Sequence, residues 1–247
     1  MKRIGSVLHL MVAAVFVICG VAFAMHPDPR IISDAARLAA PMMPSALPTG
    51  IAIPQLYLNP DNLLMWMLLI AIWLMVILDA VGQWIDPSDA EQVRAGRLRV
   101  WPMLLGALVL GAAWPSLTEH PAVLTVASIT GAVAATIGAR RATGRHRPMI
   151  GFFAGWATAL ASAALAQLAA EQFDLSAQAV SALAILPAAA FGMAAQSWIG
   201  RSVGYSAALI WAFCGLAIST MGSDPMIALA AIIGISAMAT VLIRAAS

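Results

Sequence analysis

Eight long apolar runs constrain this chain more than any other feature of its sequence. Each run is about 17 residues or longer, the length at which an α-helix crosses the roughly 30 Å hydrocarbon layer of a bilayer. Of the 247 residues, 62% are apolar and 10% are charged, whereas a soluble domain carries about 25% charged residues. Because there are too few polar side chains to cover a soluble globule, we predict an all-α, polytopic transmembrane helical bundle and exclude a water-soluble enzyme.

The runs predict about eight spans, or seven if the first is cleaved. The first run, Ile4–Met25, follows two basic residues and ends in a small-residue motif, Ala22-Phe23-Ala24, that is typical of signal-peptide cleavage sites. Its apolar stretch is longer than that of most signal peptides, so we expect it to be retained as a helix. The other candidate spans are residues 62–85, 100–117, 121–139, 149–171, 177–199, 203–220 and 225–243.

The basic residues orient these spans. With eight spans and both termini in the cytoplasm, eleven of the thirteen Lys and Arg residues lie on the cytoplasmic side, and only Arg30 and Arg37 lie outside. This asymmetry is the positive-inside pattern, so we expect a bacterial inner-membrane protein with both termini cytoplasmic. Because the net charge of +2 is spread over short clusters beside apolar runs, we expect no nucleic-acid partner.

Three segments follow from this topology. Residues 1–25 form an N-terminal transmembrane helix, residues 26–60 a periplasmic loop, and residues 61–247 a seven-helix membrane bundle. The loop holds seven of the fourteen prolines and cannot be one continuous helix. Within it, Ile31–Ala40 is predicted to form a short amphipathic helix on the outer membrane face. The inner loop 86–99 begins like a capped helix, but we expect it to be a short solvated connector.

Helix-packing signals add detail to the bundle. Two prolines, Pro115 and Pro121, lie close together between two candidate spans and predict a tight hairpin there. The motif Gly151-x-x-x-Gly155 favours close approach of helices, either within the bundle or with another subunit.

The usual catalytic constellations are missing from the sequence. It contains no G-x-S-x-G, Walker or H-E-x-x-H motif. Cys19 and Cys214 both fall inside spans and have no metal-type spacing, so neither a disulfide nor a zinc site is expected. We therefore expect a protein that is not an enzyme.

Two ionisable residues, His9 and Asp79, fall inside the apolar spans, where such groups are costly and often functional. Asp79 is about one turn from the inner end of its span, so we expect it to reach the interface, with a site role as the alternative. His9 lies deeper. Its imidazole either ligates the metal of a haem or bacteriochlorophyll or forms a hydrogen bond with a neighbouring helix.

Eight tryptophans form the most unusual count in the composition. Tryptophan gathers at both membrane surfaces, and this explains the five that lie near span ends, Trp66, Trp84, Trp101, Trp114 and Trp198. Three others, Trp73, Trp156 and Trp211, lie deeper in their spans. These three either fill the core of the bundle or line a cavity for a flat apolar ligand.

Taken together, the spans resemble a known family. The segment Gly155–Leu168 is similar to the "GW-x-T/V-A" helix of the tryptophan-rich sensory proteins, the TspO/MBR (translocator protein) family. Asn59-Pro60 followed by Trp66 and Trp73, the segment Gly111–Trp114, and the segment Tyr205–Gly215 resemble three further family motifs in order. The resemblance covers residues 57–243. Where the family carries polar Asn residues, this chain has Ser162 nearby and Ala113.

The resemblance implies a TspO-like helical core that binds tetrapyrroles or other flat apolar molecules between its helices and acts as a sensor, regulator or carrier. We expect a flat hydrophobic ligand, with porphyrin, haem or bacteriochlorophyll as candidate cofactors. The expected stacking walls are Trp73, Trp156 and Trp211, and the expected polar contacts are Ser162, Gln167 and Gln196.

An alternative function belongs to another class. The Ala- and Gly-rich helix surfaces and the additional first helix also suit a non-catalytic accessory or assembly subunit of a larger photosynthetic or respiratory membrane complex. Expected partners are therefore the lipid bilayer, a flat apolar ligand, and either a second copy of the chain or a larger complex.

Overall fold

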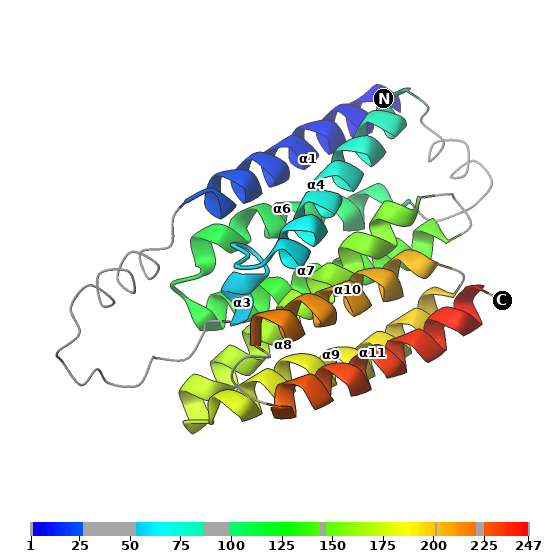
Figure 1. Ribbon diagram of the computed structural model, residues 1–247. Coiled ribbons are helices and arrows are strands. Elements are labelled where there is room, and N and C mark those ends of the chain that lie inside the picture. Colours follow the sequence, from blue (N-terminus) through cyan, green and yellow to red (C-terminus); the bar gives the residue numbers. More distant parts are fainter. Residues whose placement is uncertain are drawn as a thin grey trace.

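The computed structural model describes residues 2–26, 53–85, 99–143, 147–200, 202–220 and 225–246, and within these ranges all regular structure is helical. Figure 1 shows the long helices side by side in one bundle. The described elements are α1 (Lys2–Ala24), α3 (Ile53–Leu56), α4 (Leu63–Ile85), α6 (Trp101–Ala113), the 3₁₀ helix η1 (Trp114–Leu117), α7 (Pro121–Ala142), α8 (Pro148–Phe173), α9 (Ala177–Ile199), α10 (Val203–Thr220) and α11 (Pro225–Ala246), of which α3 and η1 are short. The predicted all-α bundle is confirmed.

Five described helices are long and apolar enough to cross a membrane. They are Gly5–Ala24, Leu63–Ile85, Pro121–Ala142, Pro148–Phe173 and Ala182–Ile199. Three further apolar helices, Trp101–Leu117, Val203–Ser219 and Leu229–Ala245, are shorter. Each coincides with a run predicted from the sequence, with ends that differ by a few residues, because run length and flanking proline set the helix limits. The predicted amphipathic helix Ile31–Ala40 and residues 86–98 of the inner loop lie outside the described residues.

Helix α8 forms the centre of the bundle. In its most apolar stretch 94% of the residues are buried within the protein, against 22% in α1. It packs mainly against α7, α9 and α10, with smaller contacts to α3 and α4. A helix that is apolar on every face has to be surrounded by other helices or by lipid, and here the surrounding helices come from both earlier and later parts of the chain.

Glycine makes the contact between α8 and α10 possible. A Cβ added at Gly155 would collide with the backbone carbonyl oxygen of Tyr205, and one at Gly151 would lie 2.7 Å from Ser202 Oγ. On the opposite helix, a Cβ at Gly204 would lie 2.7 Å from the Pro148 carbonyl oxygen. The predicted close approach at Gly151 and Gly155 is confirmed, and its partner is α10 of the same chain.

Polar caps fix the helix ends. Asn62 Oδ1 accepts a hydrogen bond from the Met65 backbone N–H (2.9 Å), which caps α4, while Asn62 Nδ2 donates to the Gly215 carbonyl oxygen at 3.1 Å. This side chain therefore fastens the beginning of α4 to the end of α10. The hairpin predicted between Pro115 and Pro121 is confirmed: η1 contains Pro115, and Pro121 begins α7.

The described arginines near helix ends gather at one end of the bundle. Arg141 of α7 donates to the Arg99 carbonyl oxygen before α6 (3.1 Å), Arg140 donates to the last carbonyl of α9 at Ile199 (3.2 Å), and Arg147 precedes α8. Both chain termini lie toward this end in Figure 1. We call it the arginine end.

Candidate functional site

An aromatic cluster lies in the interior of the bundle. It consists of Phe16 of α1, Trp114 of η1, and Phe153 and Trp156 of α8. Ring centroids of Trp114 and Trp156 are 5.3 Å apart, those of Phe153 and Trp156 are 5.8 Å apart, and Phe16 meets Phe153 edge-on at 5.5 Å. Such tilted and edge-on pairs are favourable by about 0.5–1.5 kcal/mol beyond the burial of their surface.

Helix α1 covers this cluster, and glycines at its contacts with α6 and α4 leave room for aromatic rings. The Phe16 ring occupies the space where a Cβ at Gly111 of α6 would stand, 2.9 Å from the nearest ring carbon. Further along α1, a Cβ at Gly20 would lie 2.8 Å from Nε1 of Trp73 on α4. The indole of Trp73 therefore fits against bare backbone of α1, and α1 rests on the bundle through aromatic contacts.

Two buried indole N–H groups have no hydrogen-bond acceptor among the described residues. They belong to Trp73, which is 9% exposed, and to Trp114, which is fully buried. Leaving a buried donor unsatisfied costs about 1–3 kcal/mol, and in native proteins such a group calls for an explanation. The expectation that Trp114 belongs to a membrane-surface belt is wrong, because η1 turns this residue inward at the end of α6.

The three predicted stacking walls occupy different packing environments. Trp156 belongs to the aromatic cluster, and Trp73 faces α1. Trp211 of α10 instead donates its indole N–H to the Leu64 carbonyl oxygen (3.0 Å) and meets Phe152 edge-on at 6.2 Å. Trp211 therefore connects α10 to the beginning of α4, and its indole N–H already has an acceptor within the protein.

The predicted polar contacts take part in helix connections. Ser162 donates to the Leu183 carbonyl oxygen of α9 at 3.3 Å. Buried Gln196 donates to the carbonyl oxygens of Gly200 and Ser202, both at 2.9 Å, and accepts from Ser206 Oγ at 2.8 Å. Gln196 thus secures the turn between α9 and α10, where Gly200 has a positive φ of 85°.

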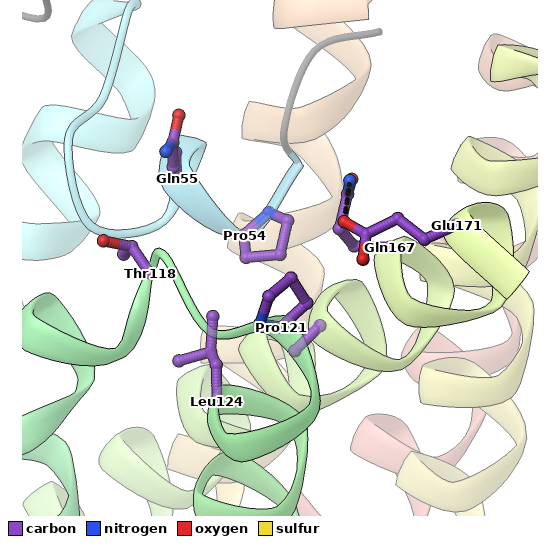
Figure 2. Close-up of a pocket in the computed structure, with 8 residues that line it drawn as sticks. Pro54, Gln55, Thr118, Pro121, Leu124, Gln167 and Glu171 are labelled. Atoms are coloured by element: carbon purple, nitrogen blue, oxygen red, sulfur yellow. Dashed lines mark hydrogen bonds between the residues drawn. The ribbon is translucent and has the colours of Figure 1, made fainter.

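Gln167 lines a pocket near the other end of the bundle from the arginines (Figure 2). The pocket has a volume of about 110 Å³ and is lined by Pro54, Gln55, Thr118, Pro121, Leu124, Ala164, Gln167 and Glu171. Figure 2 shows the Gln167 amide turned toward Glu171, to which it donates a hydrogen bond of 3.1 Å. Pockets for drug-sized ligands measure roughly 300–1,000 Å³, so this pocket is too small for a tetrapyrrole.

A buried charge cluster lies toward the arginine end and consists of His9, Asp79 and Arg147. Arg147 Nε donates to Asp79 Oδ1 at 2.9 Å and Nη2 donates to Oδ2 at 2.5 Å, a two-pronged ion pair. His9 Nε2 lies 3.8 Å from Asp79 Oδ2. The exposed fractions of the three side chains are 3% for His9, 8% for Asp79 and 6% for Arg147.

Sequence reasoning identified His9 and Asp79 separately but missed that they meet, and it missed Arg147. A signal for the pairing was present: in an antiparallel bundle, His9 and Asp79 lie at a similar depth from the same end, and an intramembrane carboxylate calls for a cationic partner. Asp79 is only 8% exposed and pairs with Arg147, which precedes α8; its expected position at the membrane interface stays a prediction.

The environment of the His9 imidazole does not suit an axial ligand of haem iron. Its Nε2 faces a carboxylate oxygen already held by a guanidinium, and the residue is closely surrounded by protein. Within the described ranges, no group of three or more His, Cys, Asp and Glu residues is placed to hold a metal ion. The metal-ligand role of His9 therefore stays a prediction without support from the geometry.

Comparisons with known proteins do not add an assignment. No protein-family model matches the chain, and no curated protein or solved structure is similar to it. The resemblance to the TspO/MBR family therefore stays a prediction based on the motifs quoted above.

Proposed function

We propose that this chain is an integral membrane protein that binds a flat apolar ligand beneath α1, at the aromatic cluster, and acts as a sensor, regulator or carrier. The observation that supports the proposal is the pair of buried indole N–H groups of Trp73 and Trp114 without acceptors. A ligand that carries carbonyl or carboxylate oxygens would supply those acceptors, while its flat body would stack on Trp156.

Ligand entry requires α1 to move, because its Phe16 packs into the cluster. Among the five span-length helices, α1 has the smallest buried share, 22% of its most apolar stretch. It is therefore the least enclosed of these helices. A flat aromatic ligand that inserts under α1 would replace the contacts of Phe16 with Phe153 and Trp156 by its own contacts with the same rings, so the net cost in packing would be small.

The proposal includes a TspO-like core, eight spans and cytoplasmic termini in a bacterial inner membrane. Gathering of Arg99, Arg140, Arg141 and Arg147 at one end of the bundle supports this topology, since cytoplasmic loops are enriched in basic residues.

Fluorescence titration tests the function directly. Purified protein in nanodiscs is titrated with protoporphyrin IX, a flat molecule with carboxylate acceptors, while tryptophan emission is followed. We expect saturable quenching, with affinity weakened roughly five- to tenfold for each lost hydrogen bond in Trp73→Phe and Trp114→Phe. Trp198→Phe is the matched control, because Trp198 is half exposed on the outer surface of α9.

Two results would overturn the proposal. One is the absence of saturable quenching, and the other is equal affinity in wild type and in the Trp73→Phe, Trp114→Phe double variant. Comigration with haem-bearing or pigmented proteins on a native gel, in the absence of porphyrin binding, would support the accessory-subunit function instead.

A further inference from the structure

Helix α9 carries a proline in its interior. Pro187 is the eleventh of the 23 residues of this helix and divides it into a first half, residues 177–186, and a second half, residues 188–199. Because proline has no backbone N–H, the Leu183 carbonyl oxygen, four residues earlier, loses the donor that an unbroken α-helix would give it. In an apolar surrounding, such a freed carbonyl needs a donor from outside the helix backbone.

Ser162 of α8 supplies that donor. Its Oγ donates to the Leu183 carbonyl oxygen at 3.3 Å, and the residue is only 8% exposed. A hydroxyl inside a helix can donate instead to the carbonyl one turn earlier in its own helix. Thr158, one turn before Ser162 on α8, does so, with 2.8 Å between its Oγ1 and the Ala154 carbonyl oxygen. Ser162 therefore makes an interhelical bond, and its acceptor is the carbonyl that Pro187 leaves without a donor.

Hydrogen bonds fasten the two halves of α9 unequally. In the second half, Gln196 Oε1 accepts from Ser206 Oγ of α10 at 2.8 Å. At the end of this half, the Ile199 carbonyl oxygen accepts from Thr143 Oγ1, which follows α7, at 2.9 Å. Among the side chains that the structure describes, Ser162 makes the one hydrogen bond from another helix to the first half. The second half is therefore fixed to two other helices, whereas the first half depends on Ser162.

We infer that α9 has a hinge at Pro187 and that Ser162 is the residue that holds it. While Ser162 Oγ donates to Leu183, the first half of α9 stays against α8. If the hydroxyl turns to the carbonyl one turn earlier in α8, as Thr158 does, the first half is free to bend about Pro187. The proline is exposed on the surface of the bundle, so the bend is limited from the side of α8. Ser162 is thus a positioning residue that acts on α9.

This inference goes beyond ligand binding and does not rest on the proposed function. The hinge lies where α8 meets α9, whereas the aromatic cluster is formed by α1, η1 and α8. Its test contains no porphyrin. Porphyrin titration can therefore fail while the hinge holds, and the hinge can fail while porphyrin binds.

Hydrogen exchange of the full chain in nanodiscs, followed by mass spectrometry at constant pH, measures the hinge. Ser162→Ala should accelerate exchange of amides in the first half of α9 roughly fivefold, the effect of losing one ordinary hydrogen bond. Amides of the second half should exchange as in the wild type. Ser197→Ala is the matched control, because Ser197 lies in the second half and donates within its own helix, to the Met193 carbonyl oxygen at 2.8 Å. It should leave the first half unchanged.

Pro187→Ala shows whether Ser162 acts through the freed carbonyl. Alanine restores the backbone N–H at this position, so Leu183 regains a donor within α9. Adding Ser162→Ala to Pro187→Ala should then accelerate exchange in the first half by less than about twofold. A serine that merely fills space would give the same acceleration in both backgrounds. That result, or equal exchange of the first half in wild type and Ser162→Ala, would overturn the inference.

Discussion

Helices α8 and α1 belong to the same bundle but are held in different ways. Helix α8 is enclosed by other helices over nearly all of its most apolar stretch, and its glycines let α10 come within backbone contact. Helix α1 lies at the edge, where Phe16, the Trp73 indole and the charge cluster hold it. Small residues that permit backbone contact leave no alternative packing, whereas aromatic rings and titratable groups can exchange partners. The difference indicates a rigid centre and a movable edge.

The largest effect is expected where the centre and the edge meet, at Asp79. Asp79→Asn removes the charge that compensates Arg147 and leaves a buried guanidinium, which should destabilise the bundle by about 3–5 kcal/mol. Thermal or denaturant unfolding in detergent measures this loss. Adding Arg147→Met should recover most of it, and a double variant as unstable as the single one would show that the pair is not what matters.

A smaller loss is expected at the rigid centre. Gly155→Ala forces a Cβ against the Tyr205 carbonyl oxygen and should cost about 1–3 kcal/mol through overpacking. Gly106→Ala on α6, where a Cβ meets nothing within 4 Å, is the matched control and should be neutral or stabilising by up to about 1 kcal/mol. Equal unfolding of the two variants would mean that α8 and α10 adjust, and that the centre is not rigid.

Substitution of two tryptophans, one in each region, should change the free energy of unfolding by different amounts. Trp211→Phe removes a hydrogen bond to Leu64 and should cost about 1 kcal/mol more than Trp73→Phe, which removes a donor without an acceptor. Unfolding of both variants in the absence of ligand tests this, since each loses similar ring area. If Trp73→Phe proves the more damaging substitution, its N–H has an acceptor in the membrane before any ligand arrives.

The smallest global effect is expected at Gly20. Gly20→Ala places a Cβ against Trp73 Nε1 and should loosen α1 while changing the overall unfolding free energy by less than about 1 kcal/mol. Hydrogen exchange should show faster α1 amides and unchanged α8 amides. Gly5→Ala, on the same helix in open space, is the control. Uniform acceleration in every helix would mean that α1 and α8 unfold as one unit.

Much of the fold was predictable from the sequence, for a physical reason. A helix that meets lipid or buried protein on every side needs an unbroken apolar run, and proline fixes where such a helix begins, as at Pro121 and Pro148. Close packing at Gly151 and Gly155 was likewise predictable, because a missing side chain is useful only where another backbone comes near.

The candidate site was less predictable, because depth in a span does not tell which neighbour a side chain faces. Trp114 lies at a helix end, where a surface belt is the usual location, yet η1 turns it into the core. Trp73 and Trp211 lie at comparable depths, yet one faces α1 and the other α4. Contacts of this kind depend on the rotation of each helix about its axis, and apolar runs with no clear face leave that rotation open.

The near-complete burial of the most apolar stretch of α8 also bears on how the protein is made. The mean hydropathy of its most apolar stretch, 1.6, is lower than the 2.6 of α1, the 2.5 of α4 and the 1.8 of α7, so the most enclosed of the span-length helices is less apolar than three of the others. During synthesis α8 leaves the ribosome before α9 and α10, which later enclose it. Until they arrive, the insertion machinery has to shelter a segment that, in the folded protein, is surrounded mainly by other helices of the same chain.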